Sequence, residues 1–422
     1  VDPLAVAEES GVGLAVLQQV AQVFVNAHHP LAIPGGAALG QSNGLTTAES
    51  VLALNAQMGN FGLPGGVFAS PLAPAQNEYH RPVSAQEMTD FITKMKNGGV
   101  KVLFVHGVNP VFELPKHLGF AEALESVPQV ISFATFPDET ALAADYIFPD
   151  HHGLESWGYQ RAVVSAKPVL SGAQPVVAPY FNTRSTADVF LAAAPESLPF
   201  ADEVAFIQSK LTILVGEEGF FFAPEINSFT AYFQQNGGWW TMDPALSSPS
   251  AANALGKRLD PGKAEFVGEG EFFFLPFVSP TLGEAGANKP WLQELADPTT
   301  TVMWNTWVEM NPATAHHMGI ENDDILEIVS EAGSVEAPVY LYPAIRPDVI
   351  AMPFGQGHTA YGQFAAGRGA NPADVLGVRF NEAGDLAFAG MKVELRKTGK
   401  KQILSRLESR IGVYGEGMGE EH

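Results

Sequence analysis

The period of the hydrophobic pattern changes along the chain, and this change restricts the possible folds more than any other feature of the sequence. In the first half, short apolar segments at 100–105, 130–133 and 146–148 alternate with stretches of helical spacing. That alternation predicts a doubly wound parallel sheet whose strands are buried on both faces and joined by right-handed crossovers. In the last third the period becomes 2, with turn residues between the segments, which predicts a compact β-barrel.

The amino-terminal part of the chain indicates a strand, glycine turn and helix unit. Helical spacing over 13–25 precedes a short apolar segment at 31–33, which we interpret as a strand ending at a glycine pair. A helix is expected over 46–58. Ser84 and Glu87 have the spacing of a capping box, so another helix is expected to begin there.

The ends of the predicted parallel strands define the expected binding cleft. Ligands of open α/β sheets bind at the carboxyl ends of the strands. In this chain those ends lead into loops that start at Gly35, His106, Thr135 and Pro149. Between the first two central strands we expect a helix over 115–124.

The second half of the chain divides into an irregular region and the barrel. Proline, glycine and serine are frequent over 186–286, so apart from a helix near 202–211 we expect connecting structure there. Its aromatic clusters at 220–222 and 272–274 are more typical of a core or an interface than of a cofactor site. Barrel strands are expected at 302–304, 325–329, 334–340, 349–352 and 392–396, with a short helix at 312–318.

Composition excludes several classes of function. The chain has no cysteine, so disulfides, thiolate zinc sites and cysteine-ligated iron-sulfur clusters are excluded within it. With 46 acidic and 23 basic residues it carries a net charge of −23, which disfavours nucleic acid and anionic lipid as partners. No segment approaches the roughly 20 apolar residues of a membrane-spanning helix, and we expect a soluble chain. Its first residue, Val1, leads us to expect a start within a longer protein or after processing.

Three ordered stretches resemble the molybdopterin oxidoreductase family, whose members bind bis-pterin guanine dinucleotide cofactors. The first is GQSNG at 40–44, followed by a glycine-rich segment at 53–66. The second begins with GVNP at 107–110 and continues with FPDET at 136–140. The third begins with EMNP at 309–312. The resemblance implies a doubly wound α/β domain followed by a six-stranded, double-psi-like β-barrel domain.

The resemblance also assigns roles to the domains and shows where the chain departs from the family. The expected domains are an α/β dinucleotide-cleft domain at 1–200, an irregular connecting insertion at 201–290, a β-barrel cofactor-cap domain at 291–398, and a basic linker with a flexible tail at 399–422. The family's amino-terminal cysteine domain and its metal-ligating residue have no counterpart in this sequence. At the barrel turn 322–324, Asn and Asp stand where the family has glycine, and both tolerate a positive φ.

Candidate cofactor-binding residues follow from these motifs. Asn109 and Asp138 could hydrogen-bond the ribose and guanine of a dinucleotide. The alternative is a purely structural role in which both side chains cap turns. His358 lies in a glycine-rich loop, where it could face a cleft or bond a neighbouring carbonyl. The complete set is Gly35, Gly107, Asn109, Asp138, Glu139, Thr140, Asp145, His358 and Asn371. No catalytic residue is assigned, because no serine, histidine and acid arrangement of the kind hydrolases use is evident. No metal ligand is assigned, because adjacent histidine pairs such as 28–29 diverge and rarely chelate one ion.

Two functional hypotheses remain open, and a third is disfavoured. Segments 344–347 and 355–362 are similar to the large subunit of alternative complex III, a membrane-bound menaquinol oxidoreductase. That resemblance implies a scaffold without its own metal on the periplasmic face of the membrane. Its expected neighbours are iron-sulfur, quinol-binding and cytochrome c subunits, which would contain the haem and the clusters.

The alternative is the cofactor-binding half of an active molybdenum or tungsten oxidoreductase that holds molybdopterin guanine dinucleotide. Bulky side chains in the cleft, such as Phe136 or Tyr361, favour the scaffold. A free-standing nucleotide-binding module is disfavoured, because the sequence does not contain the ordinary dinucleotide-binding fingerprint.

Overall fold

The computed structural model describes residues 2–76, 81–194, 196, 198–256, 262–283 and 285–407. The expected tail at 408–422 lies outside the described residues, whereas the start of the expected linker, 399–407, is described. No helix in the described ranges is long and apolar enough to cross a membrane.

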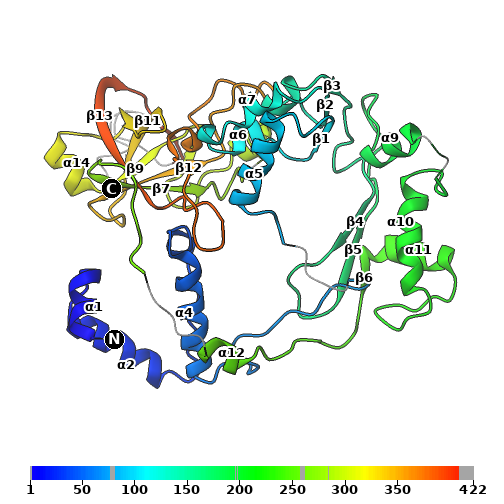
Figure 1. The fold of residues 1–422 in the computed structure, drawn as a ribbon, viewed down its shortest axis with the longest axis horizontal. Helices are drawn as coiled ribbons and strands as arrows, with labels where there is room; N and C mark the ends of the chain where they lie inside the picture. Colours follow the sequence, from blue (N-terminus) through cyan, green and yellow to red (C-terminus); the bar gives the residue numbers. More distant parts are fainter. Residues whose placement is uncertain are drawn as a thin grey trace, which may run out of the picture.

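A three-stranded parallel sheet forms the centre of the α/β domain (Figure 1). Its strands β1 (Leu103–His106), β2 (Val130–Phe133) and β3 (Tyr146–Ile147) lie in the order β1-β2-β3. The helices α5 (Ala85–Lys96) and α7 (Phe120–Leu124) contribute most of the core against one face of the sheet. The parallel sheet is therefore confirmed. The expected burial of both faces is wrong, because the second face carries exposed side chains.

The helices that connect the strands of this domain are shorter than expected. The single helix predicted over 115–124 is divided into a 3₁₀-helix, η1 (Lys116–Leu118), and α7, because Gly119 between them has φ 70°. A left-handed residue cannot continue a right-handed helix. The short helices α6 (Pro110–Glu113) and α8 (Glu139–Leu142) begin directly after the loops that follow β1 and β2.

The predicted capping box at α5 is confirmed. The Ser84 hydroxyl accepts a hydrogen bond from the Glu87 N–H at 3.2 Å, and the Glu87 carboxylate accepts one from the Ser84 N–H at 2.7 Å. Replacement of Ser84 by alanine is expected to destabilise the first turn of α5 by about 1 kcal/mol. Amide hydrogen exchange there should then be roughly fivefold faster. Ser84→Thr keeps the acceptor and serves as the control, and unchanged exchange in Ser84→Ala would contradict the prediction.

The amino-terminal segment is helical, and its predicted strand is wrong. The helices are α1 (Pro3–Ser10), α2 (Leu14–Asn26), α3 (Gly36–Leu39) and α4 (Gly44–Gln57). α2 and α4 agree with the expected helices at 13–25 and 46–58. At the expected strand 31–33, the Asn55 side chain accepts from the Ala32 N–H at 3.0 Å and donates to the Ala32 carbonyl at 2.8 Å. A side chain therefore satisfies the backbone groups that a neighbouring strand would have paired.

The region expected to be irregular contributes one strand to a second small sheet. Strands β4 (Gly158–Arg161), β5 (Val169–Ala173) and β6 (Gly238–Trp240) pair antiparallel. The surrounding elements are α9 (Thr186–Ala193), α10 (Glu203–Leu211), η2 (Thr212–Leu214), α11 (Ile226–Asn236) and α12 (Ala251–Leu255). Buried aromatic side chains, including Phe229, Phe233 and Trp239, supply a core that composition alone did not reveal. Because β6 joins strands that precede residue 200, this unit crosses the expected boundary between the α/β domain and the insertion.

The closed six-stranded barrel is confirmed, with some strands different from those expected. Its order is β10-β11-β9-β12-β7-β13. These strands are β7 (Phe272–Val278), β9 (Val308–Met310), β10 (Asp324–Val329), β11 (Ser334–Leu341), β12 (Val349–Phe354) and β13 (Met391–Lys401). The expected strand at 302–304 is instead β8 (Val302–Met303), which pairs with β14 (Ser405–Arg406) outside the barrel. The aromatic segment at 272–274 belongs to β7, so the barrel begins earlier in the sequence than residue 291.

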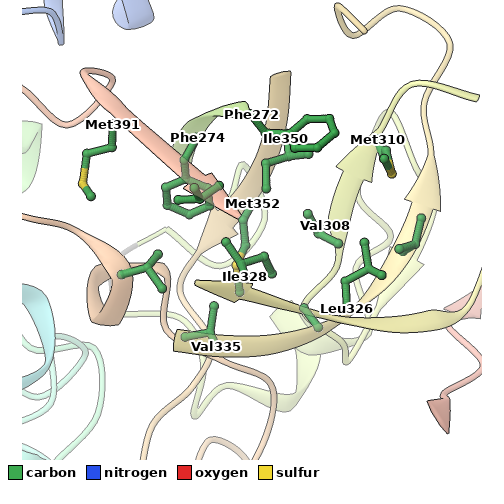
Figure 2. Close-up of a cluster of buried hydrophobic side chains, with 14 of the residues drawn as sticks. Phe272, Phe274, Val308, Met310, Leu326, Ile328, Val335, Ile350, Met352 and Met391 are labelled. Atoms are coloured by element: carbon green, nitrogen blue, oxygen red, sulfur yellow. The ribbon is translucent and has the colours of Figure 1, made fainter. Parts of the chain in front are cut away.

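Apolar side chains fill the barrel, and short helices connect its strands. Figure 2 shows Phe272, Phe274, Ile350 and Met352 among the side chains that meet in this core. The connecting helices are α13 (Pro290–Gln293), α14 (Pro312–Met318) and η3 (Pro372–Val375). At the turn where the family has glycine, Asp323 adopts φ 71°, as expected for a residue that tolerates the left-handed region.

Candidate functional site

A cavity of about 220 Å³ lies where the carboxyl ends of β1 and β2 meet a loop of the barrel domain. Gly107, Asn109 and Asp138 contribute to its wall from the sheet side. His358 and Tyr361 contribute from the loop that follows β12. The location agrees with the rule that ligands of α/β sheets bind at the carboxyl ends of the strands.

The Glu139 carboxylate joins the two domains at this cavity. It lies at the first position of α8 and accepts a hydrogen bond from the Asn109 side-chain amide at 2.7 Å. From the barrel loop it accepts the backbone N–H groups of Thr359 at 2.7 Å and Ala360 at 3.0 Å. The His358 Nδ1 lies 3.2 Å from both carboxylate oxygens. We call this arrangement the Glu139 latch.

The predicted polar residues are brought together, and they bond mainly to one another. The Asn109 side-chain oxygen accepts from the Thr140 N–H at 3.1 Å and the Thr140 hydroxyl at 2.7 Å. Asp138 caps α8 by accepting from the Ala141 N–H at 2.7 Å. Asn371 donates to the Phe112 carbonyl at 2.8 Å, which is a second link between the domains. In this arrangement these side chains determine the shape of the loops and the contact between the domains.

Aromatic rings enclose the His358 side chain. Its ring stacks on Phe112 with centroids 3.6 Å apart and planes at 15°. The Tyr361 ring lies 4.9 Å away, and the Phe136 ring meets Tyr361 edge to face at 6.0 Å. The Tyr361 hydroxyl donates to the Ala285 carbonyl at 2.9 Å. The two bulky residues named as fillers of the cleft, Phe136 and Tyr361, therefore both line the cavity.

The pKa values of the two carboxylates at the site, Glu139 and Asp138, are shifted in opposite directions. Burial alone would raise the pKa of Glu139, but hydrogen bonds from His358, Ala360 and Asn109 hold it well below its ordinary value. Burial raises the pKa of Asp138, with the neighbouring Glu139 charge adding to the effect. Burial likewise raises the pKa of the Tyr361 phenol, and Asp138 is its strongest charged neighbour. The site therefore favours a charged Glu139 beside a more easily protonated Asp138.

The polar groups and the volume of the cavity can be compared with what the cofactor of the resembled family would need. The His358 Nε2 is buried and has no hydrogen-bond partner among the described residues, so it fits a small polar ligand atom. A drug-sized ligand occupies a pocket of roughly 300–1,000 Å³, and a bis-pterin dinucleotide is larger than such ligands. A cavity of about 220 Å³ whose amides and carboxylates already bond one another accommodates a fragment and not the whole group.

Two predicted residues lie elsewhere, and some cavity residues were not predicted. Gly35 precedes α3 and does not line the cavity, and Asp145 accepts a hydrogen bond from the Val130 N–H at 2.7 Å. His106 and Asp150 do line the cavity and lie 2.8 Å apart. The positions of His106 at the end of β1 and of Asp150 shortly after β3 were the available signal, because strand ends mark the binding edge and both lie in loops expected to form the cleft. No group of three or more potential ligands in the described part of the chain could hold a metal ion.

Two family models match the chain in the order of its domains. The molybdopterin oxidoreductase model matches residues 6–194. The "Molydopterin dinucleotide binding domain" model matches residues 294–378, which include the loop that carries His358. The first match covers the sheet side of the cavity and the second covers the barrel side.

Curated relatives are similar over most of the chain. It is 28% identical to the menaquinone reductase, molybdopterin-binding-like subunit of Nitratidesulfovibrio vulgaris, over 89% of this chain and 53% of that protein. It is 23% identical to the arsenate respiratory reductase molybdopterin-containing subunit of Shewanella sp., over 85% of this chain and 56% of that protein. One of the subunits of the tetrathionate reductase of Salmonella typhimurium is also 23% identical, over 84% of this chain and 48% of that protein. The chain spans about half the length of these relatives.

A solved structure has the same fold. Acetylene hydratase from Pelobacter acetylenicus superposes with a TM-score of 0.68 at 16% sequence identity, covering 94% of this chain and 64% of that one. The parallel sheet, the closed barrel and the order of the domains thus agree with the motifs, with both family models and with the relatives. The chain belongs to the molybdopterin oxidoreductase family.

Proposed function

We propose that this chain is a molybdopterin-like scaffold, without a metal of its own, in a membrane-bound complex that exchanges electrons with a quinone. The observation that carries the proposal is the Glu139 latch. Glu139 and Asn109, at positions where the family motifs lead us to expect cofactor contacts, hydrogen-bond each other and the barrel loop. The Phe112 ring stacked on His358, and the Tyr361 ring beside them, occupy space that an open cofactor channel would need.

One relative supports a role in quinone electron transfer. The subunit from Nitratidesulfovibrio vulgaris belongs by name to a menaquinone reductase and is called molybdopterin-binding-like. We propose that the present chain functions in a complex of the alternative complex III type, on the periplasmic face of the membrane. Its partners would be cytochrome c subunits, a membrane quinol-binding subunit, plus an iron-sulfur domain or subunit, in which the haem and the clusters reside. Because the chain has no cysteine, clusters with cysteine ligands belong to those partners.

The second candidate is the cofactor-binding half of an active molybdenum or tungsten oxidoreductase. The unpartnered His358 Nε2 favours it, since a buried ring nitrogen without a partner costs about 1–3 kcal/mol. Gly107 also favours it, because the space next to its Cα is open to a ligand. In that case His358 and Asn109 would contact the cofactor, and the metal would supply the redox chemistry.

Elemental and pterin analysis of the intact complex distinguishes the two candidates. For the scaffold, we expect iron without molybdenum, tungsten or oxidised pterin fluorescence above about a tenth of one equivalent per chain. The arsenate respiratory reductase of Shewanella sp., whose subunit is named molybdopterin-containing, is the positive control for recovery. One equivalent of molybdenum or tungsten with pterin would overturn the scaffold proposal and establish the second candidate.

A further inference from the structure

Another cavity, of about 510 Å³, lies between α9 and the segment that follows β3. It shares no lining residue with the cavity beside the Glu139 latch. Its volume lies within the roughly 300–1,000 Å³ that is typical of ligand pockets. The cavity is therefore large enough for a small molecule, and the role proposed for the Glu139 latch does not use it.

One part of this cavity wall is apolar. On α9, Ala192 and Ala193 follow Val189 by three and four residues, so the three side chains share the helix face that lines the cavity. Phe148 lines the cavity from the segment after β3. Its ring stacks on Phe133 with centroids 5.7 Å apart and is still 41% exposed. Because an aromatic ring and small side chains line the same space, this wall suits a planar apolar group.

The other part of the wall carries hydrogen-bond donors that have no partner. Asn182 and Arg184 both line the cavity and are exposed. Within the described ranges of the chain, the Arg184 side chain makes no ion pair, hydrogen bond or ring contact. Every other described arginine side chain contacts an acidic group or an aromatic ring. The five N–H donors of Arg184 are therefore available to a ligand.

The charges around α9 distinguish this cavity from a neighbouring one of similar size. The neighbouring cavity, of about 500 Å³, is lined by Glu155, Asp188, Asp202 and Glu203 and by no described lysine or arginine. Among the described residues that line the cavity with Arg184, none is acidic. An anion is therefore favoured in the second cavity and repelled from the first.

The single guanidinium in the cavity restricts the class of anion. A guanidinium binds a carboxylate through two parallel hydrogen bonds. The net charge of −23 repels a polyanion more strongly than a monoanion. We propose that the cavity binds a small monocarboxylate with a planar aromatic body. The carboxylate pairs with Arg184, and the ring packs against Phe148 and α9. This inference rests on the cavity and its charge, so it stands independently of whether the chain holds a metal.

Calorimetric titration of the intact complex with naphthalene-2-carboxylate tests the proposal. Naphthalene-2-carboxamide has the same rings without the charge and is the matched control ligand. Arg184→Met removes the guanidinium, whereas Ala192→Trp fills the cavity and leaves Arg184 in place. Lys101→Met removes an exposed cation that does not line the cavity and is the control variant. Amide hydrogen exchange with and without the carboxylate locates the binding site.

The expected results depend on both the charge and the cavity. Naphthalene-2-carboxylate should bind with a dissociation constant below about 1 mM. Binding should weaken at least about tenfold in Arg184→Met, and the carboxamide should bind at least about tenfold more weakly than the carboxylate, because charge-assisted hydrogen bonds are lost. Ala192→Trp should weaken binding to a similar extent, and Lys101→Met should change it by no more than about twofold. Exchange should slow within 182–193 when the carboxylate is present.

Four outcomes would overturn the proposal. The first is the absence of saturable binding to the wild-type complex. The second is equal affinity for the carboxylate and the carboxamide, which would show that charge plays no part. The third is unchanged affinity in Arg184→Met or in Ala192→Trp. The fourth is protection from exchange only outside 182–193, which would place the carboxylate at another site.

Discussion

Replacement of Glu139 by glutamine is expected to lower the free energy of unfolding by about 3–5 kcal/mol, the range found when one partner of a buried ionic arrangement is removed. The side chain is only 9% exposed and accepts hydrogen bonds from both domains. Glutamine has one acceptor oxygen in place of two, and its NH₂ group would face the donors of Asn109 or Ala360. Buried donors would then lose their partner. Urea unfolding followed by circular dichroism measures the change.

An exposed carboxylate provides the control for the Glu139 latch. Glu122 lies on α7, and Glu122→Gln should change the free energy of unfolding by no more than about 0.5 kcal/mol. Because the latch joins the sheet domain to the barrel, Glu139→Gln should also split unfolding into two transitions. A Glu139→Gln variant as stable as Glu122→Gln would show that the latch does not hold the domains together.

The pH dependence of the Glu139 effect follows from the sign of its shift. The folded-state pKa of Glu139 lies below its ordinary value, so its contribution to stability is present above the ordinary pKa and is lost as pH falls through the folded-state pKa. The folded-state pKa of Asp138 is raised, so its contribution is present at acidic pH and is lost as pH rises through that pKa. The difference in stability between wild type and Glu139→Gln should therefore be full at pH 7 and shrink in strongly acidic solution. A difference independent of pH would contradict a charged latch.

Replacement of Phe274 by alanine is expected to destabilise the barrel by about 3–5 kcal/mol. Phe274 is 1% exposed, and on β7 it lies between β12 and β13, which pair with that strand on its two sides (Figure 2). Removal of its ring would leave a cavity that the closed barrel cannot collapse to fill. Calorimetric or urea unfolding of the variant measures the loss.

The adjacent residue on β7 is a matched control for Phe274. Phe273 points out of the barrel, where its ring contacts Phe266 and the Lys392 ammonium. Phe273→Ala should cost less than half as much as Phe274→Ala, since its ring is only partly removed from water. Equal losses at the two positions would contradict the assignment of Phe274 to the barrel core.

Most of the elements that local patterns predicted are present in the structure. The period of 3.6 located α2 and α4, and the spacing of Ser84 and Glu87 located the start of α5. The period of 2 located β10, β11 and β12. These features depend on residues within one or two turns or along one strand, so the sequence contains the information directly.

Other elements depended on partners distant in the sequence. The segment at 31–33 has a strand-like composition, but Asn55 takes its backbone hydrogen bonds. Phe272–Val278 follows a region rich in turn residues, and only its pairing with β12 and β13 makes it a barrel strand. The exposed second face of the parallel sheet could not be inferred either, because an apolar strand sequence does not show whether other elements cover both of its faces.

The sequence by itself determined the family, the order of an α/β domain and a barrel, and the loops in which the polar residues of the cavity lie. Only the tertiary structure decided how those residues are used. Glu139 bonds His358, Thr359 and Ala360, which are 219 to 221 positions away. No local pattern encodes a contact across that separation. The latch exists because the folded sheet and the closed barrel place a carboxylate and its donors against each other, away from competing water.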